Sequence, residues 1–382
     1  MLLRQDSPES AGVNPVKLKV AEEAIQEYVK AGKSHAFVFL ATRKGIIFSY
    51  KAFGTLSHEQ GSPALRIDTI FPMSSITKPI AATAALILYE EGKLDINAPI
   101  VSYVPEFTGK GKEKALVHQL MTHSTGMNDD TISNWWKENK DKVVIPPLPR
   151  NQDPNVWGFL CTGLAAPLWK QPGVEMSYCS WGLELLSDII RRTSGQSFES
   201  FVRERIFGPL GMKDSFLIVP ESVKDRIVRR PSHLDNGWYL SKEALETPYA
   251  SGGLYSTASD LAVFGQMLLD KGSYNGIRIL RPETVKEMTR NQIPGLCSQF
   301  FDEFFEEAGW GYCWDLPYGK NTIGKLVSPE AISHAGRAGA MILADPHYDL
   351  FWAMLFIDYS DQKTPFTFPG VISDMVIEAI ET

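Results

Sequence analysis

Residues 71–78 read Phe-Pro-Met-Ser-Ser-Ile-Thr-Lys and contain the pattern Ser-x-x-Lys as Ser75 and Lys78. The pattern opens the most apolar helical segment of the chain, which runs to Glu91 and which Gly92 would close. Residues three apart share a face of a helix, so the Lys78 ammonium can reach the Ser75 hydroxyl. A serine in the first turn also lies near free backbone N–H groups and the positive end of the helix dipole, both of which stabilise an oxyanion. The pattern therefore indicates a nucleophilic serine.

Spacing alone leaves a second interpretation of this serine open. Serine and lysine are common residues, and the same pattern occurs again at Ser360 and Lys363. Ser360 follows a strand-like run in a polar stretch that breaks at Pro365, so we interpret only the first copy as functional. The alternative for Ser75 is a serine that does no more than cap a helix.

The two ends of the chain carry the same kinds of element in opposite order. Asn14 followed by Pro15 is an N-cap signal, and helical spacing of apolar residues continues towards Gly32. A second helix is predicted near residues 371–380, at the other end of the chain. Between each helix and the middle of the chain lie two strand-like runs, in order 36–42, 46–52, 332–343 and 350–357.

The middle of the chain, from about Asp68, is mostly helical with long polar loops such as the Pro-rich stretch 143–154. We therefore expect an α/β (α+β) fold with two domains. Residues 1–68 and 248–382 would form a discontinuous α/β domain, in which the two ends share one antiparallel sheet flanked by the terminal helices. Residues 69–247 would form an inserted helical domain that carries the Ser-x-x-Lys and tyrosine motifs. Sites commonly form in the cleft between such domains.

Length, composition and charge exclude several classes of protein. With 382 residues, 44% of them hydrophobic, the chain has enough length for one large or two packed domains. Its 38 basic and 45 acidic residues give a net charge of −7, which is the wrong sign for a nucleic-acid-binding protein. The sequence contains no apolar run of the roughly 20 residues that cross a bilayer and no signal-peptide pattern at its start. We therefore expect a soluble, cytoplasmic protein without membrane contact.

Two further features have mainly structural interpretations. The stretch 301–307 interleaves acidic residues with phenylalanines, which predicts a helix with a solvated acidic face and an apolar back. The alternative is that this stretch forms part of a substrate mouth. The four cysteines contain no C-x-x-C pair, so we expect reduced, structural thiols.

A nucleophilic hydroxyl needs a base, and the sequence narrows the choice. It contains no G-x-S-x-G, H-E-x-x-H or H-x-H-x-D pattern, which argues against an α/β-hydrolase and a zinc hydrolase, and no metal or cofactor is expected. A lysine or a tyrosine remains as the candidate base. Tyr178 precedes a predicted helix, and a Lys78–Tyr178 pair can act as a shared proton shuttle; the alternative is a tyrosine of the core. Cys179 has no histidine near it in sequence, so we interpret it as a packing residue rather than a nucleophile.

Five motifs follow one another along the chain. They are Ser75-Ile-Thr-Lys78, Leu120-Met-Thr-His123-Ser-Thr-Gly126, Pro172-Gly173 with Tyr178, Gly252-Gly253-Leu-Tyr-Ser-Thr-Ala-Ser-Asp260 and His334-Ala-Gly336. In this order they resemble the serine β-lactamase and penicillin-binding-protein superfamily, most closely class C β-lactamases and family VIII carboxylesterases. The resemblance covers nearly the whole chain, and it favours Ser75 as a nucleophile over a plain helix cap.

The resemblance implies catalytic roles for four residues. Ser75 would be acylated, and Lys78 would assist its deprotonation. Tyr178 would match the tyrosine of the family's Y-x-N motif and act as general base, then as acid to the leaving group. The backbone N–H groups of Ser75 and Arg337 would form the oxyanion hole.

Two positions depart from the family's pattern. Ser180 replaces the asparagine of Y-x-N, and His334-Ala335-Gly336 replaces K-T-G on an edge strand; these residues are the expected substrate contacts. A histidine is neutral for much of the time near pH 7, so both changes favour an ester or a small amide over a β-lactam. The Arg337 side chain either supplies a replacement charge or points to solvent. The motifs at His123 and Gly252-Gly253 would be structural.

The expected function follows from these residues. We expect a serine hydrolase that acts through an acyl-enzyme on carboxylic esters. The alternatives are a β-lactamase, a D-amino-acid peptidase or an amide hydrolase with the same nucleophile, and a non-catalytic binding module with the same cleft. The tryptophan-rich segment 127–168 would lie beside the cleft, either lining an acyl pocket or packing in the core. The expected partner is a small-molecule ester or amide, and the sequence leaves the oligomeric state open.

Overall fold

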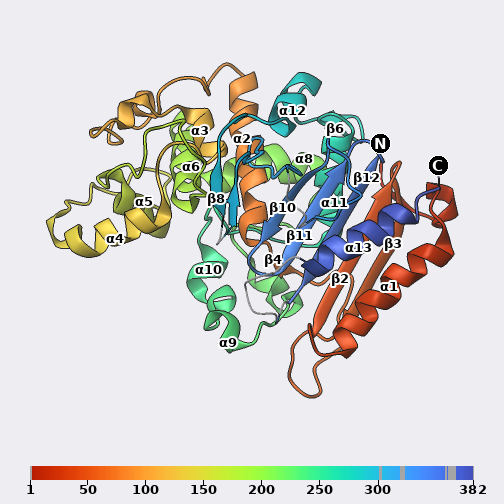
Figure 1. Ribbon diagram of the computed structural model, residues 1–382. Helices are drawn as coiled ribbons and strands as arrows, with labels where there is room; N and C mark the ends of the chain where they lie inside the picture. The colour runs from red at the N-terminus through yellow and green to blue at the C-terminus, as the bar shows by residue number, and fades with distance from the viewer. Residues whose placement is uncertain (1, 301–302, 319–322, 358, 360–366, 382) are drawn as a thin grey trace.

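A six-stranded sheet with the order β1-β3-β2-β12-β11-β10 forms the centre of the computed structural model, which describes residues 2–300, 303–318, 323–357, 359 and 367–381 (Figure 1). Its strands are β1 (Arg4–Gln5), β2 (Ala36–Arg43), β3 (Ile46–Gly54), β10 (Ile332–Gly336), β11 (Ala340–Asp345) and β12 (Leu350–Phe356). β12 pairs antiparallel with β2, from Leu350 opposite Arg43 to Phe356 opposite Phe37. Strands from both ends of the chain thus share one sheet, which is antiparallel except between β1 and β3 and confirms the predicted fold.

Both faces of this sheet are covered. The helices on one face are α1 (Pro15–Lys30) and α13 (Thr367–Glu378), which Figure 1 shows side by side. Every residue of β2 and β12 is buried, because alternate side chains enter two different cores. Phe39 packs in the core beneath α1 and α13, and Leu40 packs in the larger core on the opposite face. The terminal helices therefore flank the sheet, as predicted.

The opposite face is covered by α11 (Ala258–Leu269), which approaches β12 closely at Gly265. A Cβ at Gly265 would lie 2.0 Å from Cδ2 of the buried Phe351 ring. We expect Gly265→Ala to lower the free energy of unfolding by about 1–3 kcal/mol, measured by denaturant titration. The matched control is Gly158→Ala in another helix, where no heavy atom lies within 4 Å, and stability should stay level or rise by up to about 1 kcal/mol. Equal losses in both variants would contradict this account of the packing.

The middle of the chain is mostly helical, as predicted. Its helices are α2 (Thr77–Glu90), α3 (Val117–Met121), α4 (Asp129–Asn139), α5 (Pro154–Leu164), α6 (Ser180–Ser194), α7 (Phe198–Val202), α8 (Gly208–Leu210), α9 (Ser232–Asp235) and α10 (Lys242–Glu246), and α12 (Pro282–Thr289) follows α11. In α2 all residues from Thr77 to Leu88 are buried, because this apolar helix is surrounded by other elements. The division at residues 68/69 and 247/248 stays a prediction.

The α-helix that follows the Ser-x-x-Lys pattern begins later than its sequence predicts. It starts at Thr77, and Ser75 lies in a preceding 3-10 turn, η2 (Ser74–Ile76), whose first residue has a φ of 46°. A left-handed residue cannot belong to an α-helix, so the helical geometry is delayed. Just before this turn, β4 (Phe71–Pro72) pairs with β5 (Tyr255–Ser256), and Gly252 of the Gly252-Gly253 motif lies next to the backbone of Ser74.

Two predicted elements are wrong. The run 332–343 is not one strand but parts of β10 and β11, because the chain reverses at a turn that ends with Gly339 at a φ of 93°. Of the stretch predicted as a helix, residues 301–302 lie outside the described residues, and residues 303–305 form a strand instead, β9 (Glu303–Phe305), which pairs with β8 (Ser298–Phe300). A bridge from Ser298 to Met176 ties the hairpin to the chain before Tyr178, and such long-range pairing outweighs local helical spacing.

Three other observations complete the fold. A small hairpin, β6 (Ser273–Tyr274) with β7 (Ile277–Arg278), follows α11. The second Ser-x-x-Lys copy, at residues 360–363, lies outside the described residues. Across the described ranges, every helix is too short or too polar to cross a bilayer.

Candidate active site

Ser75 and Lys78 meet at the start of α2. The Lys78 side chain is completely buried, and its Nζ donates to Ser75 Oγ at 2.9 Å and to the backbone oxygen of Ser251 at 2.7 Å. Ser75 is only half-buried, so it remains accessible from solvent. Because two oxygens hold the ammonium, Lys78 is fixed in the direction of the serine hydroxyl.

Tyr178 lies beside this pair. Lys78 Nζ is 4.8 Å from the centroid of the Tyr178 ring, within the distance at which a cation and an aromatic face attract each other. Tyr178 is half-buried in the extended segment that leads into α6. The fold thus brings a hydroxyl, an ammonium and a phenol together from segments about 100 positions apart in the sequence.

Two polar residues at the start of α4 hold the chain on both sides of Tyr178. Asn128 Nδ2 donates to Ser177 Oγ at 3.0 Å. The Asp129 carboxylate accepts from the N–H of Ser180 at 2.7 Å and from the N–H of Trp181 at 3.0 Å, which caps α6. Sequence reasoning missed both residues, since nothing local links position 129 with position 180.

Cys179 is a packing residue by its environment. It is buried, and its thiol donates to Asp129 Oδ1 at 3.3 Å. Burial, with the Asp129 charge as the next cause, raises the pKa of the Cys179 thiol well above its ordinary value. A nucleophilic cysteine needs the thiolate, which this environment disfavours. All four cysteines carry free thiols.

Three aromatic side chains surround the Tyr178 ring. The His123 ring centroid lies 4.4 Å away, that of Trp310 6.0 Å away and that of His334 6.4 Å away. His123 Nδ1 accepts from the N–H of Cys179 at 3.2 Å, so it also fixes the backbone after the tyrosine. Trp310 was missed from the sequence, because no motif marks it.

Both histidines in this layer are neutral at ordinary pH. Burial, followed by the charge of Lys78, lowers the pKa of His334 to about 3, and the same causes lower the pKa of His123 well below its ordinary value. His334 Nδ1 donates to the carbonyl of Ala335 at 3.0 Å, which leaves Nε2 as an acceptor. Among the described residues, that Nε2 has no hydrogen-bond partner. His334 therefore supplies no positive charge.

The end of β10 is pressed against the residues that precede Ser75. A Cβ at Gly336 would lie 2.1 Å from the Met73 carbonyl oxygen, so only glycine fits. Two positions later, the N–H of Ala338 donates to Ser74 Oγ at 3.2 Å, and the carbonyl of Ala338 accepts from the Arg230 guanidinium. Residue 337 lies between these two contacts, next to the 3-10 turn that carries Ser75.

Comparison with known proteins identifies the family of the chain. The sequence model of the family described as Beta-lactamase matches residues 21–363. The chain belongs to the Beta-lactamase family. As a member, it is a hydrolase of the β-lactamase and penicillin-binding-protein type, which confirms the resemblance seen in the sequence motifs.

Relatives of this Beta-lactamase family protein carry several names. Protein Rv1367c of Mycobacterium tuberculosis is 28% identical over 71% of each chain. A protein of Escherichia coli K12 named putative D-alanyl-D-alanine carboxypeptidase is 25% identical over 90% of this chain and 83% of its own. Among solved structures, EstCE1, a hydrolase with promiscuous acyltransferase activity, has a TM-score of 0.76 at 18% identity and covers 94% of this chain and 98% of its own. A family VIII carboxylesterase has a TM-score of 0.72 at 20% identity, over 96% of this chain and 99% of its own. The structures at these identities establish the fold of the family and no more.

The remaining predicted site residues differ in their burial and in the direction of their side chains. Ala335 alternates to the far side of β10 and packs with the core beneath α1 and α13, so only its backbone can face a ligand. Ser180 begins α6 and is half-buried. Arg337 is exposed, which agrees with a side chain that reaches solvent. Trp157 of the tryptophan-rich segment is buried in the core. The described residues contain no group of His, Cys, Asp or Glu side chains arranged to hold a metal ion.

Proposed function

We propose that the protein is a serine hydrolase that forms an acyl-enzyme on Ser75 and acts on carboxylic esters. The observation that carries the proposal is the contact of 2.9 Å between Ser75 Oγ and the buried Lys78 Nζ. A buried ammonium aimed at a solvent-accessible hydroxyl is costly to bury and has no evident structural purpose. It is the arrangement that an activated nucleophile requires.

Each step of the proposed reaction uses a group at this site. Ser75 Oγ attacks the ester carbonyl and gives its proton to the phenolate of Tyr178, a base that the neighbouring Lys78 ammonium stabilises, while the negative charge passes to the carbonyl oxygen. Tyr178 then returns the proton to the alcohol as the C–O bond breaks, which leaves the acyl group on Ser75. A water molecule, activated in the same way, attacks the acyl-enzyme and releases the acid.

The N–H groups of Ser75 and Arg337 are the proposed oxyanion hole. The first amides of a helical turn have no acceptor within it, which applies to Ser75 as the second residue of η2. The contacts of Gly336 with Met73 and of Ala338 with Ser74 hold the Arg337 backbone beside that turn. Such preorganised donors stabilise the charge that develops in the transition state.

Gly336→Ala tests this arrangement. The added Cβ has to displace β10 from Met73, so we expect kcat for a p-nitrophenyl ester to fall by about 100-fold or more. Gly252→Ala is the matched control, because its Cβ would meet the Ser74 backbone at an ordinary 3.7 Å. The prediction fails if both variants, checked to be folded by circular dichroism, keep the wild-type kcat.

The preference for esters rests on the absence of charge at His334. β-Lactams and D-amino-acid peptides carry a carboxylate that a cation would anchor, whereas His334 is neutral and offers an acceptor nitrogen. Two of the structural neighbours are named as a hydrolase and a carboxylesterase. The name of the Escherichia coli relative supports the second candidate, a D-amino-acid peptidase.

A panel of substrates distinguishes the candidates. We expect kcat/KM for short p-nitrophenyl esters to exceed that for nitrocefin and for a D-Ala-D-Ala peptide. If kcat/KM is higher for nitrocefin or for the peptide, the ester assignment is wrong, and Ser75 remains the proposed nucleophile. Tight ligand binding with no turnover of any member of the panel would support a binding module instead.

A further inference from the structure

Glu184, on α6, is a buried carboxylate that the proposed reaction does not use. Its side chain is 0% exposed, and its two oxygens accept from the N–H of Ala250 at 3.0 Å and from the N–H of Ser251 at 2.9 Å. The carbonyl of the same Ser251 accepts from Lys78 Nζ at 2.7 Å. One residue thus connects the carboxylate on its N–H side to the ammonium on its carbonyl side.

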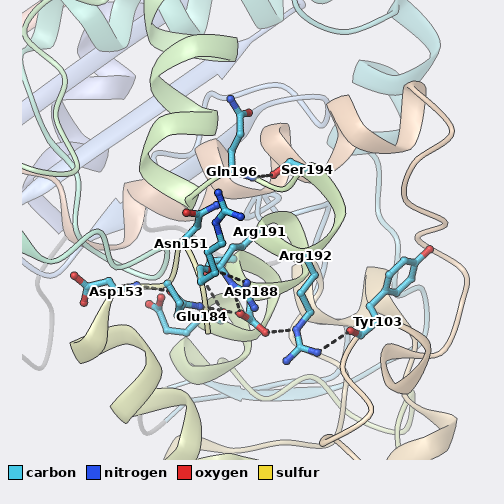
Figure 2. Close-up of polar contacts among 12 residues, drawn as sticks. Tyr103, Asn151, Asp153, Glu184, Asp188, Arg191, Arg192, Ser194 and Gln196 are labelled. Atoms are coloured by element: carbon cyan, nitrogen blue, oxygen red, sulfur yellow. Dashed lines mark hydrogen bonds and ion pairs between the residues drawn. The ribbon is translucent and has the colours of Figure 1, made fainter. Parts of the chain in front are cut away.

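A second buried carboxylate on α6 shows how unusual the environment of Glu184 is. Asp188, one turn further on and also 0% exposed, is neutralised by two guanidinium groups, Arg191 at 2.8 Å and Arg192 at 2.7 Å (Figure 2). In the described part of the chain, no lysine or arginine forms an ion pair with Glu184. An uncompensated buried charge is costly, so a positive charge close by has to stabilise Glu184.

Lys78 is a cation whose charge acts on Glu184. Burial raises the pKa of Glu184, while the hydrogen bonds from the Ser251 side chain and from the N–H groups of residues 250–251, and after them the charge of Lys78, oppose that rise. One titratable group beside Lys78 is Tyr178, whose ring centroid lies 4.8 Å from Nζ and which is the proposed base of the reaction. Burial lowers the pKa of His123 and His334 and raises the pKa of the Cys179 and Cys313 thiols, so these four groups supply no negative charge. Glu184 supplies the carboxylate that these other groups around Lys78 lack.

We propose that Glu184 is a positioning residue for the reaction, which anchors residues 250–251 so that the Ser251 carbonyl holds Lys78 against Ser75. It also places a buried carboxylate on the other side of the Ser251 peptide from the Lys78 amine. The inference rests on the proposed function, because it gives Glu184 a purpose only if Lys78 acts on Ser75. A purely structural carboxylate would stabilise the turn without affecting the reactivity of Ser75 or its pH dependence.

Glu184→Gln tests the proposal, because glutamine keeps the shape and one acceptor but removes the charge. We expect kcat for a p-nitrophenyl ester to fall by about 10- to 100-fold with little change in KM, since Lys78 is no longer held in place. Labelling of Ser75 by a fluorophosphonate, whose fluoride leaves as the Oγ–P bond forms, should slow to a similar extent. The alkaline limb of the pH profile should move to lower pH, because the ammonium has lost its counter-charge.

Two further variants make the result specific. Asp188→Asn removes an equally buried charge from the same helix, and it should lower stability without shifting the pH profile. Glu184→Asp keeps the charge, so its pH profile should remain close to that of the wild type even if its rate falls. If Glu184→Gln does not fold, the pH profiles of Glu184→Asp and Asp188→Asn are compared instead. The proposal is overturned if both profiles shift, or if only the profile of Asp188→Asn shifts.

The outcomes separate this inference from the proposed function. If the wild-type protein is labelled by the fluorophosphonate and Glu184→Gln is labelled at the same rate with the same pH profile, only the role of Glu184 is overturned. If the wild-type protein is not labelled at all, the nucleophile itself is wrong, and the role of Glu184 falls with it.

Discussion

Ser75→Ala is expected to lower kcat for short p-nitrophenyl esters by about three orders of magnitude or more. Without Oγ no acyl-enzyme forms, and only the oxyanion hole and substrate binding can still accelerate direct attack by water. The measurement is steady-state turnover of p-nitrophenyl acetate by wild-type and variant protein at equal concentration. A variant that keeps the wild-type kcat would contradict the assignment of Ser75.

The neighbouring serine provides the control. Ser74 Oγ lies 2.7 Å from Tyr239 Oη and accepts from the N–H of Ala338, so it serves the backbone rather than the substrate. Ser74→Ala should therefore lower kcat by about 10-fold, through a looser oxyanion hole, and leave the covalent step intact. Equal losses in the two serine variants would show that the 3-10 turn, not one hydroxyl, is responsible.

Lys78→Met is expected to lower kcat/KM for the same esters by about 10²- to 10⁴-fold. Methionine fills most of the buried volume but removes the charge that touches Ser75 and lies against the Tyr178 ring. The proposed base, the phenolate of Tyr178, then loses the positive charge that stabilises it. Steady-state kinetics over a range of pH, with the thermal midpoint recorded for each protein, measures the effect.

Lys112→Met is the matched control for this variant. Lys112 is also buried, with its Nζ donating to the Leu164 carbonyl and lying 5.0 Å from the Phe107 ring centroid, but it has no contact with Ser75. Both variants should therefore change in stability, because each loses a buried lysine. Activity per folded molecule should change only in Lys78→Met. Comparable kcat/KM values for the two variants would contradict the role of Lys78.

Local spacing explains what the sequence could predict. Ser75 in the 3-10 turn and Lys78 in the first turn of α2 are three residues apart, so their contact needs no knowledge of the rest of the fold. The shared sheet was also predictable, because hairpins with strand-like patterns occur at both ends of the chain. Tyr178 and the end of β10 were placed by the resemblance to a family, since no local pattern links them to Ser75.

Long-range contacts explain what the sequence could not predict. Trp310 packs against Tyr178, Asp129 caps α6 and Glu184 holds residues 250–251, and each contact joins segments at least 50 positions apart. Whether His334 is charged depends on its burial and on the nearby charge of Lys78, which a sequence does not display. The hairpin of β8 and β9 was missed for a related reason, because a bridge to Met176 overrides its helical spacing.

Mass spectrometry of the intact protein after incubation with a fluorophosphonate tests the central claim most directly. The account predicts one adduct per chain, and peptide mapping should place it on Ser75 rather than on Ser74 or Cys179. Ser75→Ala should give no adduct, and Lys78→Met should acquire it much more slowly than the wild type. An unmodified wild-type protein, or an adduct at any other residue, would contradict the claim that Ser75 is a nucleophile activated by Lys78 and Tyr178.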